Sequence, residues 1–539
     1  MQATRRFGQD IELRFDDTRW SVREEEGVRE EAIAGRARTG AADGAAWIAQ
    51  RVVSAGLARA ATPVPLERLA AVGTRALDAD VAPVLHVRLP PEENVVLLVE
   101  SEGVVAWQFP DDSGLVAGSR RPRAEAIRDV RFTVVEPMRA GVAHAAAHAA
   151  FAGWPVQGLQ IVVLRMLARP IAGGIVNRLE GRKHEGPVVV DDAADPSRWD
   201  QLDAFPFLKA VPNGPARILL FVHGSFSSVR SAFGGLCATA PGRAFLDAAH
   251  QRYAAVWGWD HRTLSVDPRA NAVKLYEALA AVTVASPPVI DVVCHSRGAL
   301  VVRSLVEEVL PGKTWRPAIG RVIFAAGANA GTLFARPANW HALLDLATNL
   351  VLADRRALSL VGAAPLALAA GEAIEYIADF VGCLVDGPFV EAVAPGLAAM
   401  DPDGAFVHEI NGANPGEPAP DACEYYAIES DFEARLADGA TQGPPEFPRR
   451  LVLLLANGFV DALMQGAAND LLVDVRSMTS INPPAREVRA VQDFGRNARV
   501  YHTNYFLQPP TVEALVRWLL AARGAGGAIH PQARAAAPA

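Results

Sequence analysis

The sequence predicts an α/β protein built on a mostly parallel sheet with helices on both faces, preceded by a smaller α+β region. Between residues 215 and 330, apolar β-branched runs alternate with helical patterns, which is typical of strands and helices that alternate along a parallel sheet. Residues 335–415 interrupt this alternation with long apolar helical segments, which predict a helical cap inserted into the sheet domain. Because ligands bind such sheets at the carboxyl ends of the strands, polar residues that follow a strand are the candidate site.

The chain of 539 residues is long enough for several domains. We expect an N-terminal α+β domain of unknown role over residues 1–200, the sheet domain over residues 201–525, and a disordered Ala/Gly-rich tail over residues 526–539. Within the N-terminal domain, ENVVLLVESEGVVAWQF predicts a hairpin that turns at Ser101-Glu102-Gly103. Residues 139–180 show a helical pattern.

Composition and charge exclude several classes of function. The net charge is −8 and no basic stripe stands out, so nucleic-acid binding is not expected. The N-terminus lacks the apolar core of a secretory signal, and no uncharged apolar run reaches the roughly 18 residues of a membrane span. We therefore expect a cytoplasmic protein. The cysteines are too far apart for a structural zinc site or a disulfide framework; they are Cys237, Cys294, Cys383 and Cys423.

The most informative segment is VIDVVCHSRG, residues 289–298, which continues directly into a helical pattern. A strand that runs into a helix through a sharp turn projects the serine of that turn, Ser296, away from the sheet. Ser296 is therefore either a nucleophile or an ordinary polar turn residue. In the usual G-x-S-x-G pattern the first glycine stands where this chain has Cys294, which is small and which we expect to be a buried packing residue.

A nucleophilic serine needs a base, and the base needs a third group to orient it. In this fold class the acid and then the histidine follow the serine along the chain. Of the histidines after Ser296, His341 and His408 lie in or beside the expected cap, and His530 lies in the tail. His502 lies on a loop between a strand-like run and the last helix, so we expect it to be the general base.

The expected acid lies in NDLLVDVRSM, which we interpret as a loop and a short strand. Asp470 is the preferred residue because it sits on the turn that opens this segment. Asp474, inside the strand-like run, is the alternative, and Asp493 is a weaker third candidate.

A nucleophilic serine also needs two backbone amides that stabilise the developing oxyanion. We expect one from Arg297, directly after the serine. The other comes from the loop after the HG strand, which is most simply Ser225 and alternatively Phe226.

The runs VHGSFSS, CHSRG, NDLLV and YHTNYF resemble the α/β-hydrolase superfamily on its lipase and esterase side. They are similar to bacterial triacylglycerol lipases and to GPI-inositol-deacylase-like hydrolases. WGWDHRT, TNLVL and PGLAAMDP are similar to runs in bacterial hydrolase domains found beside CHAT peptidase domains. The resemblance covers about residues 215–523.

The resemblance implies a serine hydrolase that cleaves carboxylic esters through a Ser296–His502–Asp470 triad and an acyl-enzyme intermediate. No metal or organic cofactor is implied. The alternatives are an amidase, peptidase or acyltransferase with the same triad, or a non-catalytic interaction or signalling module of the same fold. The apolar cap is either a lid over an acyl-binding pocket, which favours lipophilic or small-molecule esters, or a core of its own. The sequence leaves the oligomeric state open.

Overall fold

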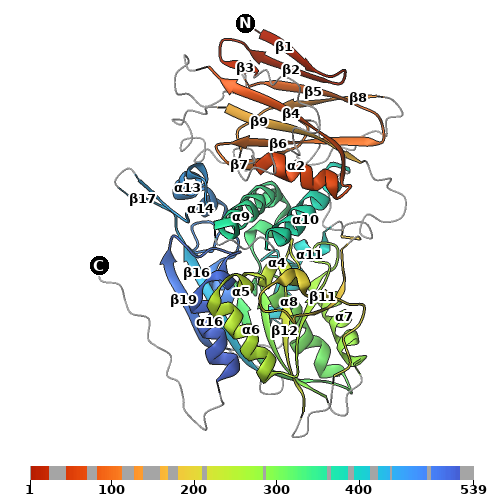
Figure 1. Cartoon of the computed structure of the whole chain (residues 1–539), viewed down its shortest axis with the longest axis vertical. Helices are drawn as coiled ribbons and strands as arrows, with labels where there is room; N and C mark the ends of the chain where they lie inside the picture. The colour runs from red at the N-terminus through yellow and green to blue at the C-terminus, as the bar shows by residue number, and fades with distance from the viewer. Residues whose placement is uncertain are drawn as a thin grey trace.

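The computed structural model describes most of the chain (Figure 1). His530 and the tail over residues 526–539 lie outside the described residues. The described ranges are residues 2–22, 44–69, 82–111, 127–137, 158–167, 180–181, 183–208, 215–282, 287–360, 366–386, 394–412, 423–437, 440–481 and 487–521.

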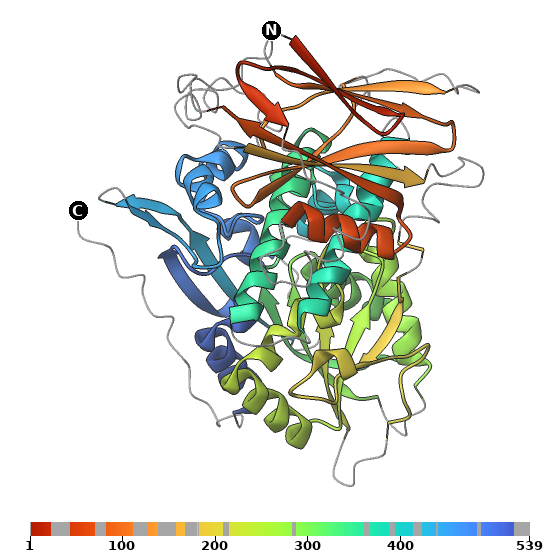
Figure 2. The ribbon, with the colours of Figure 1, turned by 45° about the horizontal axis from the view of Figure 1, so that its top comes forward.

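The N-terminal region contains two antiparallel sheets that pack face to face (Figures 1 and 2). The strand orders are β1-β2-β5-β8 and β3-β4-β9-β6-β7, and an apolar layer that includes Leu13, Leu97 and Phe132 fills the space between them. Helix α2 packs against the five-stranded sheet. The elements are β1 (Gln2–Phe7), β2 (Ile11–Asp16), β3 (Trp20–Val22), α2 (Gly44–Ser54), β4 (Ala58–Arg68), β5 (Val84–Leu89), β6 (Glu93–Ser101), β7 (Val104–Gln108), β8 (Arg128–Thr133) and β9 (Gly158–Leu167).

Two expectations for this region have different outcomes. The hairpin is present as β6 and β7, and its turn residues Glu102 and Gly103 have φ angles of 49° and 80°, the left-handed values of a type I′ turn. The helix expected over residues 139–180 is wrong where the structure describes it, because residues 158–167 form β9. Since β9 lies between β4 and β6 and is largely buried, it lacks the clear alternation by which a half-buried strand is recognised.

The second unit is an eight-stranded mixed sheet in the order β11-β10-β13-β12-β14-β15-β16-β19. The strands from β13 to β19 in this order are parallel, and β10 and β11 are antiparallel at one edge. The sequence places the start of this domain at residue 201. β10 lies before that residue and β11 ends at it, and both strands belong to the sheet of this domain. The strands are β10 (Gly186–Val189), β11 (Asp200–Gln201), β12 (Arg217–Val222), β13 (Ala255–Asp260), β14 (Val289–His295), β15 (Ala318–Ala325), β16 (Glu424–Phe432) and β19 (Val488–Asn497).

Helices cover both faces of this sheet. Alternate residues of β12 point to opposite sides: Leu219 and Phe221 pack with α6 (Ala240–Arg252) and α16 (Pro509–Leu515), whereas Leu220 and Val222 pack with α7 (Pro268–Ala280) and α8 (Gly298–Arg303). The chain passes from β12 to β13 on one side and then to β14 on the other. The strand order therefore reverses at β12 and β14, and such a switch point leaves a crevice at the carboxyl ends of the strands.

The cap helices, α9 (Trp340–Leu360) and α10 (Leu366–Asp386), lie between the N-terminal sheets and the eight-stranded sheet (Figure 1). They are inserted between β15 and β16, together with the short helices α11 (Pro395–Ala398) and α12 (Ala405–Gly412). Within the described part of the chain, no helix combines the length and apolar content needed to cross a membrane.

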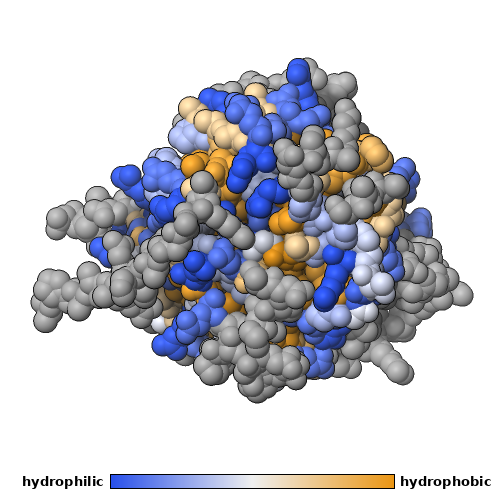
Figure 3. All heavy atoms as spheres, turned by 90° about the horizontal axis from the view of Figure 1, so that it is seen from below, coloured by the Kyte–Doolittle hydropathy of each residue, from blue (hydrophilic) through white to orange (hydrophobic). Residues whose placement is uncertain are grey.

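Large exposed apolar side chains are dispersed over the described surface. Phe207 lies in a loop, Val491 on β19 and Val516 after α16. From the end of the molecule opposite the N-terminal sheets, hydrophilic and apolar residues are interspersed (Figure 3). The large continuous cluster of apolar side chains is instead buried, around the cap helices.

Side chains of α9 bind the backbone of β7, which is the edge strand of its sheet. Trp107 N donates to Asp345 Oδ1 at 2.8 Å and Val105 N donates to Asn349 Oδ1 at 3.0 Å. Asn349 Nδ2 donates to Val105 O at 2.7 Å, and the Trp107 indole donates to the Thr348 hydroxyl at 2.9 Å. These bonds satisfy backbone groups that an edge strand otherwise leaves unpaired, so they attach the cap to the N-terminal sheets.

We predict that Asn349→Ala lowers the free energy of unfolding by about 2–4 kcal/mol, because it leaves the buried amide and carbonyl of Val105 without partners. Urea denaturation measures this change. The control is Asn457→Ala, whose exposed side chain bonds only the nearby Leu453 carbonyl and whose loss should change stability by about 0.5 kcal/mol or less. Equal effects of the two substitutions would contradict the attachment of the cap through Asn349.

Candidate active site

Ser296 lies on a sharp turn between β14 and α8 and has a φ of 54°, a left-handed value that is strained for a residue with a side chain. Two glycines allow the turn to approach β12. A Cβ on Gly298 would lie 2.4 Å from the Val222 carbonyl oxygen, and a Cβ on Gly224 would lie 2.6 Å from the Ser296 Cβ. Both positions therefore require glycine.

Cys294 precedes this turn on β14 and is fully buried in the sheet. Its Sγ lies 3.4 Å from the Ile323 carbonyl oxygen, and burial raises the pKa of the thiol well above its ordinary value. The thiol thus packs against β15, and the turn closes without a glycine at this position.

The structure brings Ser296, His502 and Asp470 together in one buried chain of hydrogen bonds. His502 Nε2 lies 3.0 Å from Ser296 Oγ, and His502 Nδ1 lies 2.9 Å from Asp470 Oδ2. The His502 backbone amide also donates to the Asp470 carbonyl at 2.9 Å, which fixes the two loops to each other. This arrangement can move a proton from the serine hydroxyl to the imidazole while the carboxylate orients the ring.

Asp470 receives further donors from its own loop and from the last loop of the chain. Its Oδ1 accepts the Leu472 and Val473 amides at 3.2 and 2.9 Å, and its Oδ2 accepts the Tyr505 hydroxyl at 3.2 Å. Asp470 is completely buried. These donors fix the carboxylate in one orientation toward His502.

The other candidate acids and histidines have different positions. Asp474 caps α15 (Val475–Thr479) by accepting the Arg476 amide, so the short strand expected here is a helix. Asp493 is exposed on β19 and His408 is exposed on α12. The His341 ring packs on Phe109 with 4.7 Å between ring centroids.

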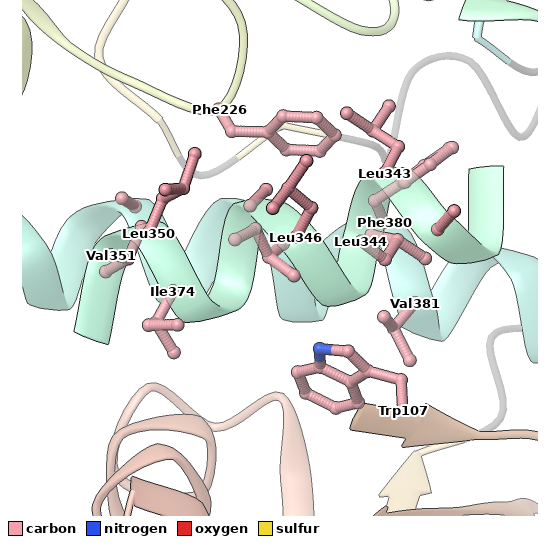
Figure 4. Close-up of a cluster of buried hydrophobic side chains, with 14 of the residues drawn as sticks. Trp107, Phe226, Leu343, Leu344, Leu346, Leu350, Val351, Ile374, Phe380 and Val381 are labelled. Carbon is pink, nitrogen blue, oxygen red and sulfur yellow. The ribbon is translucent and has the colours of Figure 1, made fainter. Parts of the chain in front are cut away.

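The amides expected to form the oxyanion hole lie around Ser296. Among the described residues, the backbone amides of Ser225, Phe226 and Arg297 have no hydrogen-bond acceptor. The Arg297 side chain turns away and donates to the Gly396 carbonyl at 3.0 Å. Phe226 has a φ of 53° and packs against the cap helices (Figure 4). Both side chains thus anchor their own segments and leave the amides available.

A cavity of about 1240 Å³, including the open solvent at its mouth, lies over Ser296 and His502. The residues of α9 that line it recur at helical spacing, on the side of α9 opposite to Asp345 and Asn349. Polar lining groups come mostly from the loops that carry Ser225, Ser296 and His502, and Asp354 adds a carboxyl group from α9. The apolar lining includes Phe226, Phe334, Leu343, Ala347, Val351, Leu358, Ala370, Ala373, Ile377, Leu397 and Met400.

The model of one protein family, described as "Domain of unknown function (DUF7379)", matches residues 185–520. The match contains the eight-stranded sheet, the cap helices and the hydrogen-bonded residues Ser296, Asp470 and His502. The chain belongs to the DUF7379 family. No curated protein sequence matches this DUF7379 member.

Solved structures similar to this DUF7379 member include lipases and esterases. Phospholipase PlaB from Legionella pneumophila has 12% identity and a TM-score of 0.29, with 49% of this chain and 46% of that chain covered. A metagenomic carboxyl esterase has 16% identity and a TM-score of 0.30, with 64% and 89% covered. Lipase 1 from Pelosinus fermentans has 14% identity and a TM-score of 0.34, with 56% and 98% covered. The DUF7379 chain spans less than half the length of PlaB.

Two buried histidines beside the serine are features that sequence reasoning missed. His295 Nε2 donates to the His502 carbonyl at 2.8 Å, and burial lowers the pKa of His295 to about 3. His223 accepts the His261 amide at 3.1 Å, and burial lowers the pKa of His223 to about 3 as well. Both rings are therefore neutral near pH 7. The sequence signals were the place of His295 directly before Ser296 and the place of His223 in the HG run.

Glu180, another residue that the sequence did not single out, holds the loop after β13. Its buried carboxylate accepts the backbone amides of Thr263, Leu264 and Ser265 at 2.7, 3.0 and 3.0 Å. Asp260, at the end of β13, accepts the Val229 amide at 2.7 Å. Asp260 and Thr263 thus fix loops in this DUF7379 member.

We predict that His295→Gln weakens the loss of stability in acid. Below a pH of about 6.5 the unfolded chain binds a proton at His295, whereas the folded protein does not bind this proton until about pH 3. Between these pH values, each unit by which the pH is lowered therefore costs about 1.4 kcal/mol of stability for this group. Gln removes this titration and keeps a donor for the His502 carbonyl. Urea denaturation at several pH values between about 6.5 and 4 measures the slope.

The control for this prediction is His408→Gln, because His408 is exposed on α12 and its loss should leave the slope unchanged. A wild-type slope in His295→Gln would contradict the prediction.

Proposed function

We propose that this protein is a serine hydrolase of the α/β-hydrolase type that cleaves carboxylic esters with lipophilic acyl groups. The observation that carries the proposal is the buried chain of hydrogen bonds from Ser296 through His502 to Asp470, at the switch point of the parallel sheet and beneath an apolar cavity. A turn serine without a catalytic role would need neither an imidazole at 3.0 Å nor a strained φ of 54°.

In the proposed mechanism, Ser296 Oγ attacks the ester carbonyl carbon while His502 Nε2 takes the serine proton. Asp470 holds the His502 ring through Nδ1 and stabilises the imidazolium that forms. The backbone amides of Arg297 and Ser225 donate to the oxyanion of the tetrahedral intermediate. His502 then gives its proton to the leaving alcohol. Water next attacks the acyl carbonyl carbon while His502 takes a proton from it, and His502 returns this proton to Ser296 as the carboxylic acid leaves.

The cavity supports an apolar acyl group in the substrate. Its lining includes Leu343, Ala347 and Val351 of α9 and Ala373 and Ile377 of α10, and all of these side chains are buried. An acyl chain placed among them leaves water, and each buried methylene contributes about 0.8 kcal/mol. Binding energy is therefore expected to rise with chain length until the cavity is filled.

We predict that Ser296→Ala abolishes labelling by a fluorophosphonate probe and lowers kcat/KM for p-nitrophenyl butyrate by about 10⁴-fold or more. Asp470→Asn should lower kcat by a similar factor, because an amide cannot hold the imidazole in the required tautomer. Asp474→Asn is the matched control and should keep close to the wild-type rate, since Asp474 caps α15. The measurements are probe labelling and steady-state hydrolysis.

Two outcomes would decide against this assignment. Labelling that survives in Ser296→Ala would mean that another residue is the nucleophile. A larger loss in Asp474→Asn than in Asp470→Asn would exchange the two acids.

We predict that wild type prefers p-nitrophenyl octanoate to p-nitrophenyl acetate in kcat/KM, and that Ala347→Phe reverses this preference. The added ring occupies space along α9 that a long acyl chain needs, whereas acetate does not reach it. A series of p-nitrophenyl esters from two to about twelve acyl carbons measures the profile. A uniform loss for all chain lengths in Ala347→Phe would contradict an acyl site along α9.

A further inference from the structure

Asp354 stands apart from the other residues around the cavity. Among the described residues that line the cavity, it is the one carboxyl group, and it lies on the same side of α9 as Val351 and Leu358. The proposed mechanism gives it no role. A carboxyl group at the wall of an apolar cavity is costly unless polar groups meet it, so its partners indicate what it does there.

The described part of the chain supplies Asp354 with fewer donors than a carboxyl group can accept. The Tyr501 hydroxyl lies 3.1 Å from Asp354 Oδ1 and 2.9 Å from Glu446 Oε1, so two carboxyl groups compete for one phenolic proton. The Thr503 hydroxyl also lies beside Asp354. Because a carboxylate has about four acceptor positions, the described residues leave about two of them for a group inside the cavity.

The effect of burial on the pKa of Asp354 agrees with this shortage of donors. Burial raises the pKa of Asp354 to about 7, and the neighbouring Glu446 charge acts in the same direction, against the Thr503 and Tyr501 hydroxyls. A carboxyl group whose donors were complete would be expected to ionise more readily.

The position of Asp354 along the reaction axis follows from its neighbours. Tyr501 and Thr503 are the residues on either side of His502 in the chain, and His502 delivers a proton to the leaving alcohol. Asp354 therefore lies beside the loop that carries the proposed proton donor for the leaving alcohol. Leu343, in the apolar part of the cavity, is about 16 Å away along α9, at 1.5 Å per helical residue.

We infer that Asp354 determines specificity for the alcohol half of the substrate and selects esters whose alcohol carries a further hydroxyl group, such as monoacyl esters of a polyol. The free hydroxyl donates to the Asp354 carboxyl while the acyl chain lies against the apolar residues of α9 and α10. A simple alkyl alcohol leaves the remaining acceptor positions of this carboxyl without a donor, which disfavours its ester. This inference rests on the proposed ester hydrolysis.

The test compares 1-butyrylglycerol with propyl butyrate, which share the acyl group and a three-carbon alcohol and differ in two hydroxyl groups. We expect wild type to prefer the glycerol ester in kcat/KM by about tenfold, the effect of one or two hydrogen bonds to substrate. Asp354→Leu should remove most of this preference. Asp354→Asn, which keeps an acceptor without a charge, should retain most of it.

The control variant is Glu446→Gln. Glu446 shares the Tyr501 hydroxyl with Asp354 but does not line the cavity, so its loss disturbs the support of Tyr501 without touching substrate. It should change both esters by the same factor. If Asp354→Leu also lowers both esters equally, Asp354 acts only through Tyr501 and the inference is overturned.

A second pair of esters separates a hydroxyl from a cationic group. Butyrylcholine and 3,3-dimethylbutyl butyrate have the same shape and differ in charge. A preference for butyrylcholine that both Asp354→Asn and Asp354→Leu abolish would assign Asp354 to a cation and overturn the hydroxyl. Failure of wild type to hydrolyse any of the four esters would count against the proposed function itself, whereas equal hydrolysis of all four overturns this inference alone.

Discussion

The interaction on which the rest of the structure depends is the two-sided packing of α9. One side bonds the backbone of β7 through Asp345 and Asn349, and the other side lines the cavity through Leu343, Ala347 and Val351. Trp107 and Phe226 lie on opposite sides of the cap helices (Figure 4). Opening the cap as a rigid lid would break buried hydrogen bonds, and each group left unsatisfied costs about 1–3 kcal/mol. The N-terminal sheets therefore hold one wall of the cavity in place.

A second constraint is the close approach of β12 and β14 at their carboxyl ends. The strain at Ser296 is of the order of 1–3 kcal/mol for such a φ value. It persists because β14 is buried between its neighbours and because the Ser296 amide donates to the Ala325 carbonyl at 3.0 Å. Gly224 and Gly298 remove the side chains that would keep the two loops apart. The reversal of strand order makes room above this point, which is where the cavity lies.

Local patterns made much of the candidate site predictable. The strand–serine–helix run needs only neighbouring residues to be recognised, and His502 followed from the small number of histidines after Ser296. Long-range contacts were not predictable in the same way. Glu180 meets residues 263–265 only in the folded chain. β9 is largely buried between two strands, so its sequence lacks the alternation by which a half-buried strand is recognised. Asp354 was not a candidate in the sequence, because nothing near it along the chain indicates Tyr501.

Residues 501–505 connect the cap to the chain of hydrogen bonds. Tyr501 bonds Asp354 on α9, His502 bonds Ser296, and the Tyr505 hydroxyl donates to Asp470. Hydrogen bonds thus connect β7 to α9 and α9 to Tyr501, which directly precedes His502 in the chain. Asp470 accepts from two backbone amides as well as from two side chains, so it is fixed from several directions. Among the described residues, Asp354 meets the hydroxyls of Tyr501 and Thr503, so a ligand hydroxyl in the cavity can add to its hydrogen bonds where it cannot add to those of Asp470.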